Sequence, residues 1–317
     1  MAAVGCAGLL VEDSFCGPVS ALPPEGALLI LDNIPVRAGG CAANVAISLA
    51  RQSVSVEVAG CVGRDTGADM LRNAFTAAQV GCTRVVGVES SSTSKTVILL
   101  IEGQDRRYFH AIGANRAFSV EHLPLSWLST LKVFYLGGLC ALPGIDFEKL
   151  RVLLKRCREF GVTTIVDVVA PHNFDDVAKI KTLLPFVDTF VPNEDESRVI
   201  TGLTRPSDQL RAFESAGANT VIVTRGGNGC IALHRGEMYS CGAYQMEVVD
   251  PSGSGDAFTS GVIASLLRGA TMPDILQYAS AMGASATRAA GTTDSVFSAP
   301  QAQAFIKAHP LTVIKET

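Results

Sequence analysis

Short runs of β-branched residues alternate with helical patterns along most of the chain, and this rhythm predicts the fold class. Residues 54–62 are a strand candidate, followed by an amphipathic helix at 66–79. The same order continues through strands at 132–136, 162–169, 189–192 and 220–224 and helices at 147–160, 195–201 and 207–216. Such a βαβα order indicates a mainly parallel sheet covered by helices on both faces.

Two segments break this rhythm and predict a second, smaller β-layer. Residues 27–36 alternate apolar and polar positions without a helical pattern beside them, and residues 96–112 are typical of two strands around the turn Gly103-Gln104-Asp105. One-sided strands of this kind usually belong to an antiparallel sheet with one face away from the main core. An apolar face there must be covered, so we expect a lid over a cleft or a dimer surface.

The composition indicates an enzyme-sized globular protein. Of the 317 residues, 48% are hydrophobic and 18% are charged, enough for one large α/β domain or two smaller ones. No apolar run approaches the roughly 20 residues of a membrane-spanning helix, and the first ten residues lack the basic start of a signal peptide. We therefore expect a cytoplasmic protein with no membrane partner. The net charge of −4, without a block of Lys or Arg, argues against nucleic acid but not against a nucleotide.

Nine cysteines are scattered through the sequence without a recognisable metal or redox spacing. They stand at positions 6, 16, 41, 61, 82, 140, 157, 230 and 241. No C-x-x-C occurs, and the odd number argues against a closed set of disulfides. Several lie in apolar runs, where Cys behaves as a small hydrophobic residue. We interpret them as buried or idle thiols, since the spacing expected of a zinc site is missing.

A glycine-rich stretch near the C-terminus is the main candidate for chemistry. After a predicted strand at 245–249 comes D-P-S-G-S-G-D, and an apolar helix is predicted at 257–267. Small residues at a helix start let backbone N–H groups approach a ligand, which predicts an anion site. Asp256 at the same place fits a general base in phosphoryl transfer. The alternative is that Asp256 caps the helix and the glycines form a tight turn.

Five motifs together resemble the ribokinase-like, or PfkB-type, carbohydrate kinases. The segment 250–261 is similar to the C-terminal signature D-[TS]-x-G-A-G-D-x-F of that family, with Pro251 and Ser254 as departures. G-G-C-A-A-N-V-A at 39–46 is similar to its N-terminal G-G-x-x-x-N-x-A, and G-C-V-G-R-D follows it. P-N-E-D-E at 192–196 fits N-x-x-E, and T-R-G-G-N-G at 224–229 fits T-x-G-x-x-G. The matches come in family order and cover nearly the whole chain.

The resemblance implies both a fold and an activity. The fold would be a single domain over residues 1–317, three-layered, with a mainly parallel central sheet between helices and a β-sheet lid from about 14–38 and about 91–114. The activity would be ATP-dependent phosphorylation, with Mg²⁺, of a primary hydroxyl of a small sugar or sugar acid. The predicted lid strands suggest a homodimer through the lid. The alternatives are a nucleoside or vitamin-type alcohol kinase of the same fold, and a non-catalytic sugar-binding protein.

The resemblance also implies a role for each matching residue. Asp256 would be the catalytic base, and the N–H groups of Gly253, Ser254 and Gly255 the anion hole. The other implied contacts are, for the sugar hydroxyls, Asp13, Gly39, Gly40 and Asn44; for Mg²⁺ and the phosphates, largely through water, Asn193 and Glu196; for the nucleotide, Thr224, Gly226 and Gly229; and for a monovalent cation such as K⁺, Asp250, Ser252, Gly291 and Ser295.

Departures from the family pattern bear on the substrate. Cys41 stands where some relatives carry Lys. Relatives that act on phosphorylated sugars need cations near the lid, and the candidates here are Arg37, Arg106, Arg107 and Arg116. We interpret these arginines as solvated, which favours a neutral or carboxylated sugar over a sugar phosphate.

Four further positions leave the contacts open. Glu12 could take the role of Asp13, its neighbour in the sequence. His110 and Asn115 lie on the predicted hairpin or just after it, near the substrate or on the surface. Ser280 stands where the family often places Asn beside the adenine, so the usual amide contact on that side of the nucleotide is missing.

Overall fold

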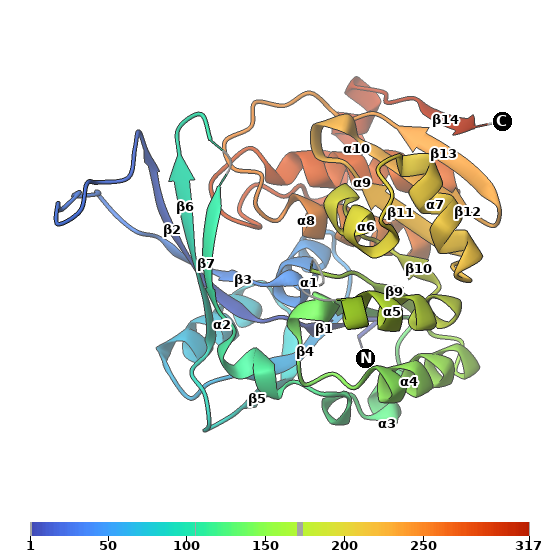
Figure 1. The fold of residues 1–317 in the computed structure, drawn as a ribbon, viewed down its shortest axis with the longest axis horizontal. Coiled ribbons are helices and arrows are strands. Elements are labelled where there is room, and N and C mark those ends of the chain that lie inside the picture. The colour runs from blue at the N-terminus through green and yellow to red at the C-terminus, as the bar shows by residue number, and fades with distance from the viewer. Residues whose placement is uncertain (1, 105, 170–173, 317) are drawn as a thin grey trace.

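The computed structural model describes residues 2–104, 106–169 and 174–316, which fold into two sheets and two layers of helices (Figure 1). One sheet has ten strands and the other has four. The large sheet lies between the helix layers, and the small sheet stands off one side of the body.

The large sheet is parallel over most of its width, as the alternating pattern predicts. Its order is β14-β13-β12-β11-β10-β9-β8-β1-β4-β5. The seven strands from β11 to β5 pair in parallel, whereas β12, β13 and β14 join antiparallel at one edge. The strands are β1 Val4–Gly8, β4 Val56–Val62, β5 Gly81–Gly87, β8 Val133–Gly137, β9 Thr163–Val166, β10 Thr189–Phe190, β11 Thr220–Thr224, β12 Cys230–His234, β13 Glu237–Cys241 and β14 Val313–Glu316.

Helices cover both faces of this sheet because its strands are apolar on both sides. In β11 the side chains of Val221 and Val223 enter one hydrophobic core, and that of Ile222 enters the other. The helices packed in the core of Ile222 are α1 Cys41–Arg51, α2 Thr66–Ala77, α8 Ser254–Leu267, α9 Met272–Ala286 and α10 Ala299–Ala308. Those on the opposite face are α3 Leu125–Leu128, α4 Phe147–Glu159, α5 Phe174–Leu183, α6 Glu194–Thr201 and α7 Pro206–Ser215.

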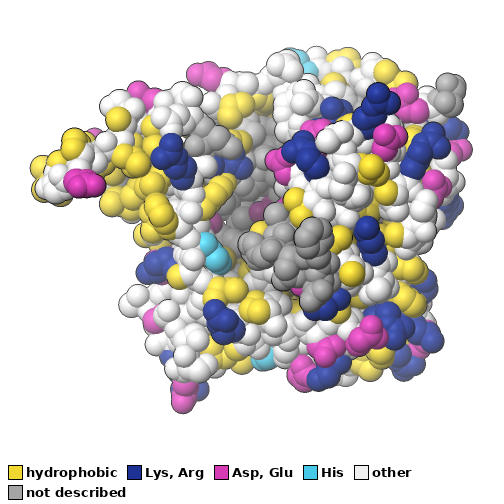
Figure 2. Space-filling view, viewed as in Figure 1, with side chains coloured by type: hydrophobic (Ala, Val, Ile, Leu, Met, Phe, Trp, Pro, Cys, Tyr) yellow, Lys and Arg dark blue, Asp and Glu magenta, His cyan; other side chains and the backbone are white. Residues whose placement is uncertain are grey.

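Of the two segments predicted to form a separate β-layer, the small sheet contains the hairpin at 96–112 but only the last residue of 27–36. Its order is β3-β2-β6-β7, with β2 at Val11–Val19, β3 at Val36–Gly39, β6 at Ser94–Ile101 and β7 at Arg107–Ala111. The hairpin expected at 96–112 is confirmed as β6 and β7, although Asp105 of its turn lies outside the described residues. Figure 2 shows the surface hollowed between this sheet and the body, with hydrophobic side chains gathered on the projecting part.

Two strand predictions were wrong, and both segments lack a place in a sheet. Residues 27–36 have no regular structure before β3, and Leu28 and Ile30 are 85% and 83% exposed, so their alternating pattern faces no core. Residues 245–249 also form no strand. Both edges of β13 are already paired, and the N–H groups of Val249 and Asp250 donate to the carbonyl of Thr287 after α9 instead.

The parallel strands end at one common edge, and the loops after them carry several of the sequence motifs together with one carboxylate, Asp167, that lies outside the motifs. Asp167 follows β9, Asn193 follows β10 and the glycine-rich turn at 226–229 follows β11. Ligands of open α/β sheets bind at this edge. No helix within the described ranges is both long and apolar enough to cross a membrane.

Candidate active site

The first turn of α8 presents Asp256 beside the glycine-rich turn. Gly253 is the N-cap residue with φ of +76°, and a Cβ there would lie 2.3 Å from the carbonyl oxygen of Thr292. A Cβ at Gly255 would meet no atom within 4 Å. The N–H of Ser254 makes a long contact of 3.3 Å with the carbonyl of Pro251. The turn therefore needs glycine at 253 for its backbone, and at 255 it leaves open space at the positive end of a helix.

The carboxylate of Asp250 stabilises this turn through hydrogen bonds to backbone N–H groups. Its buried carboxylate accepts hydrogen bonds from the N–H of Ser252 at 2.9 Å and from the N–H of Gly291 at 3.1 Å. The carbonyl of Ser295 accepts from Arg288 at 2.9 Å. The Oγ of Ser252 is buried and has no hydrogen-bond partner among the described residues. Of the residues expected at a monovalent cation, Asp250 and Ser295 thus have internal partners, whereas the Ser252 hydroxyl does not.

The amide of Asn44, on α1, links Asp256 to the body of the protein. Its Nδ2 donates to Oδ2 of Asp256 at 2.8 Å, and its Oδ1 accepts from the hydroxyl of Thr292 at 2.8 Å. Because an ionised carboxylate only accepts hydrogen bonds, the amide is oriented with its N–H₂ group toward Asp256. Burial raises the pKa of Asp256 to about 6, and the hydrogen bonds from Asn44 and Cys41 oppose that rise.

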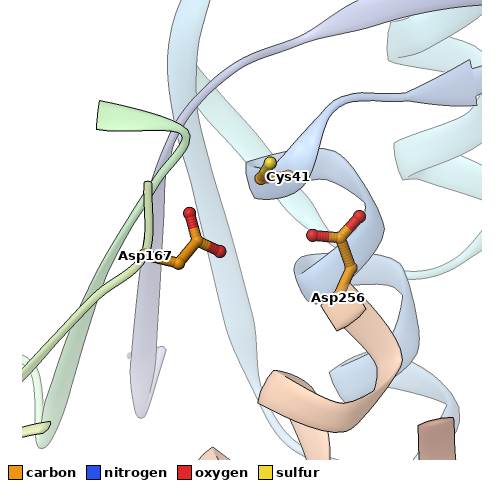
Figure 3. A group of neighbouring side chains, drawn as sticks. All are labelled: Cys41, Asp167 and Asp256. Carbon is orange, nitrogen blue, oxygen red and sulfur yellow. The ribbon is translucent and has the colours of Figure 1, made fainter. Parts of the chain in front are cut away.

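A second carboxylate, Asp167, faces Asp256 across the cleft (Figure 3). The ligand atoms of Cys41, Asp167 and Asp256 all lie within 4.8 Å of one another. Asp167 accepts a hydrogen bond from the hydroxyl of Tyr135 and another, at 2.5 Å, from the N–H of Gly138. Burial, and then the charge of Asp256, hold the pKa of Asp167 well above its usual range. Sequence reasoning missed Asp167; the signal was a carboxylate directly after a buried strand.

Asp13 approaches the same cleft from the small sheet. It lies on β2 opposite Thr96 of β6, and a Cβ at Gly39 of β3 would lie only 1.8 Å from its Oδ2. Burial raises the pKa of Asp13 to about 7, the hydrogen bond from Thr96 opposes this, and the charge of Asp256 adds to it. Glu12 points to the other face, where it pairs with Lys95 at 2.8 Å. Asp13 is therefore the carboxylate of this pair that faces Asp256.

The remaining polar groups around Asp13 have local partners. Gly40 is the N-cap of α1 with φ of +88°, and a Cβ there would lie 2.5 Å from the carbonyl oxygen of Leu9. His110, exposed on β7, lies 3.0 Å through its Nδ1 from the hydroxyl of Thr96. Asn115 is fully buried, and its amide bonds both backbone groups of Leu10. Asn115 thus supports the start of β2, and its amide is already occupied there.

The arginines near the small sheet are mostly occupied or exposed. Arg37 forms an ion pair with Asp294 at 3.1 Å. Arg106 and Arg107 each hydrogen bond a neighbour on their own hairpin, and Arg116 is exposed. These contacts agree with the interpretation of the four arginines as surface residues.

Asn193 and Glu196 form a capping box at the start of α6. The Oδ1 of Asn193 accepts from the N–H of Glu196, and Oε2 of Glu196 accepts from the N–H of Asn193, both at 2.8 Å. Burial raises the pKa of Glu196 to about 7; the N–H of Asn193 opposes this, and the charge of Asp256 adds to it. Glu196 is thus a buried carboxyl whose ionisation the charge of Asp256 opposes.

A cavity of about 270 Å³ opens next to the start of α8. Its walls include the turn after β11, the segment 243–248 and one side of α9. Thr224, Gly226 and Gly229 line it, together with Ser254 and Gly255 of α8 and Ser280 of α9. The sequence motifs at 224–229 and 253–256 therefore meet at a single cavity.

Comparisons with known proteins agree with this arrangement. The profile described as pfkB family carbohydrate kinase matches residues 10–299. A ribokinase of Haemophilus influenzae is 22% identical over 278 residues, which cover 86% of this chain and 88% of the ribokinase.

Two solved structures show the same fold. A putative ribokinase II of E. coli in complex with ATP and Mg²⁺ superposes with a TM-score of 0.82 at 20% identity, covering 98% of this chain and 100% of that one. Ribokinase of Arabidopsis thaliana, complexed with ribose and ATP, gives 0.81 at 22% identity, covering 97% and 99%. Together with the profile match, these likenesses confirm the ribokinase-like α/β fold with its separate small sheet. The chain therefore belongs to the pfkB family of carbohydrate kinases.

Proposed function

We propose that the protein transfers the γ-phosphoryl group of ATP to a primary hydroxyl of a small neutral sugar. The observation that carries this proposal is the position of Asp256. Its carboxylate lies at the N-terminus of α8, between the cavity lined by the 224–229 turn and the cleft bordered by Asp13. A base placed between a nucleotide site and a polyol site is what phosphoryl transfer to an alcohol requires.

The nucleotide would occupy the cavity next to α8. Thr224, Gly226 and Gly229 line one wall, and Ser254 and Gly255 line the wall nearest Asp256. Phosphates at that wall would meet the N-terminal N–H groups of α8 and the positive end of its dipole. Ser280 gives the α9 wall a hydroxyl in place of an amide, so this wall offers the adenine ring a single small polar group.

Bound cations would balance the negative charge of this site. The carboxyls of Glu196, Asp167 and Asp256 have raised pKa values at one end of the sheet, which suits a place that a cation normally occupies. Glu196, oriented by Asn193, would hold Mg²⁺ through water, and Mg²⁺ supplies charge neutralisation at the phosphates. The unpartnered hydroxyl of Ser252, with backbone oxygens near Asp250, fits a K⁺ site behind the anion hole.

In the proposed reaction each group near α8 has a separate role. Asp256 accepts the proton of the substrate hydroxyl as that oxygen attacks phosphorus, and Asn44 holds the carboxylate in place through its 2.8 Å hydrogen bond. The N–H groups of Gly253, Ser254 and Gly255 stabilise the charge on the transferred group. Asp13 and Asn44 bind other hydroxyls of the sugar. The small sheet acts as a lid that excludes water when substrate is bound.

The charge of the cleft favours a neutral acceptor within the class of sugars and sugar acids. Asp13, Asp167, Glu196 and Asp256 all face it, while Arg37 is already paired with Asp294. A carboxylated or phosphorylated sugar would bring a negative charge beside Asp256, which must be ionised to act as the base, and this costs free energy unless a cation accompanies it.

A coupled assay with MgATP and a panel of neutral sugars, sugar acids, sugar phosphates and nucleosides tests this function. We expect turnover on one or a few neutral sugars, and none above background with Asp256→Asn as the blank. Turnover on nucleosides alone would replace the sugar with a nucleoside as the substrate class. Sugar binding without consumption of ATP would contradict the kinase proposal.

The outer face of the small sheet supports pairing with a second copy of this chain. Phe109 on β7 is 67% exposed and points away from the face that carries His110, and Leu28 and Ile30 in the adjoining loop are also largely exposed. An exposed apolar face of this kind is typical of a protein–protein contact that buries it. Light scattering should give a dimer that Phe109→Asp weakens, whereas Val152→Asp, at an apolar position on α4 that is 55% exposed, should leave it intact. A monomer at all concentrations would contradict this pairing.

A further inference from the structure

The cluster of Cys41, Asp167 and Asp256 has a chemistry that phosphoryl transfer does not require. The base and the nearby carboxyls suffice for the reaction, yet a thiol stands among them. We propose that these three side chains form a binding site for a thiophilic divalent cation, with Zn²⁺ as its natural representative.

The geometry of the cluster is close to that of a three-ligand zinc site. The sulfur and one carboxylate oxygen of each aspartate lie within 4.8 Å of one another. Ligand atoms of one tetrahedral zinc lie roughly 3.5 Å apart, so the side chains would close by about 1 Å around the ion. Figure 3 shows the three groups converging from the starts of α1 and α8 and from the end of β9.

The surroundings hold two of the three ligands in place and leave a way in. Asp167 is buried and held by Tyr135 and by the N–H of Gly138, and Asp256 is held by Asn44. Such outer hydrogen bonds orient metal ligands in proteins. Cys41 and Asp256 are only half-buried, so an ion can enter from the cleft and keep a water or a substrate oxygen as its fourth ligand.

Charge and ligand type determine which ions fit. Two carboxyls and a thiol face one another here within 4.8 Å, so their ionised forms would repel one another. A divalent cation removes that repulsion, and the thiol binds it by releasing its proton: R–SH + Zn²⁺ gives R–S–Zn⁺ + H⁺. Thiolate ligands select Zn²⁺ and Cd²⁺, whereas Mg²⁺ demands oxygen ligands. The site is therefore distinct in selectivity from the proposed magnesium site.

Metal binding at this place would also stop turnover, and this consequence rests on the proposed function. A carboxylate of Asp256 that ligates Zn²⁺ no longer accepts a proton from the substrate hydroxyl. Metal binding and inhibition are separate measurements. If the kinase proposal fails, the binding measurements still test the metal site.

The test is titration of the reduced protein with Cd²⁺, followed by the ultraviolet charge-transfer band of a cadmium thiolate, and then competition by Zn²⁺. The variant is Cys41→Ser, and the matched control is Cys140→Ser, a half-buried thiol just after β8 that is not part of the cluster. We expect the wild type and the control to bind one equivalent that excess Mg²⁺ does not displace. Cys41→Ser should lose that equivalent of the band and bind Zn²⁺ at least about tenfold more weakly.

Asp167→Asn gives a second arm that does not alter the thiol. It should weaken Zn²⁺ binding at least about tenfold while the cadmium thiolate band remains at saturation. It also carries the test if Cys41→Ser does not fold. The proposal is overturned if Cys41→Ser binds Cd²⁺ and Zn²⁺ as the wild type does, if Asp167→Asn has unchanged affinity, or if Mg²⁺ displaces the bound ion.

Discussion

Removing the amide of Asn44 should move the acid limb of the pH–rate profile to higher pH. Asp256 works as a base only when ionised, so activity falls as pH drops through its pKa of about 6. The Nδ2 of Asn44 donates to the ionised carboxylate at 2.8 Å and thereby opposes the rise in pKa that burial causes. Without that donor, the neutral acid becomes relatively more stable, and the pKa of Asp256 rises further.

The size of this shift follows from the strength of the hydrogen bond. A bond to a charged group contributes about 1.5–3 kcal/mol, and one pKa unit corresponds to about 1.36 kcal/mol. Asp256 is half-buried, so water can replace part of the lost bond, and a shift of about one pKa unit is the expected result. At pH 7 the variant would then be roughly half ionised at Asp256.

The assay is kcat/KM for the accepted sugar, measured from about pH 5 to pH 9 in wild type and Asn44→Ala, because this ratio reports the pKa values of the free enzyme. Loss of a sugar contact would raise KM at every pH, whereas loss of the bond to Asp256 moves the limb. Thr292→Val is the matched control, since it removes the donor to Oδ1 of Asn44 but leaves the donor to Asp256. Identical limbs in wild type and Asn44→Ala would refute this reasoning.

Four further substitutions probe the turn, the sugar site and the buried carboxyl. Gly253→Ala should lower the free energy of unfolding by more than about 1 kcal/mol, because φ is +76°. Gly255→Ala should leave the free energy of unfolding unchanged or raise it and yet reduce turnover. A loss of stability in both variants would contradict the role of Gly255. Gly39→Ala should raise KM for the sugar at least tenfold without changing MgATP affinity, because its Cβ would displace Asp13, and calorimetric titration with MgATP checks the second half. Asp167→Asn should raise the melting temperature more at about pH 8 than at about pH 4. A carboxyl whose pKa is raised in the folded state destabilises the protein as pH rises above its unfolded pKa, and the neutral amide removes this effect. Equal effects at both pH values would argue against a protonated Asp167.

Much of the fold was accessible from the sequence because its signals are local. The strand at 220–224 and the helix at 147–160 show their period within a few residues, and the structure confirms both as β11 and α4. The failures at 27–36 and 245–249 have different causes. The alternating pattern of 27–36 faces no core, and Leu28 and Ile30 are exposed. At 245–249 the preceding strand β13 is already paired on both edges, which a linear pattern does not report.

The site shows the same division between local and distant information. Asp256 and its glycines stand together in the sequence, so they could be predicted as a unit. Asn193 and Glu196 could also have been recognised as a capping box from their spacing alone. Asp167 and Thr292 belong to no motif, and their importance arises from contacts with Asp256 and Asn44 that only the folded chain creates.

The most direct test of the proposed chemistry is the turnover of Asp256→Asn with saturating MgATP and the accepted sugar. Asn keeps the shape of the side chain but accepts no proton, and a positioned general base contributes about 10²–10⁴-fold. We predict that kcat falls by at least a hundredfold while the affinity for MgATP, measured by calorimetry, stays within about twofold. A kcat within about tenfold of the wild type, or roughly 1.4 kcal/mol of barrier, would contradict the assignment of Asp256 as the base.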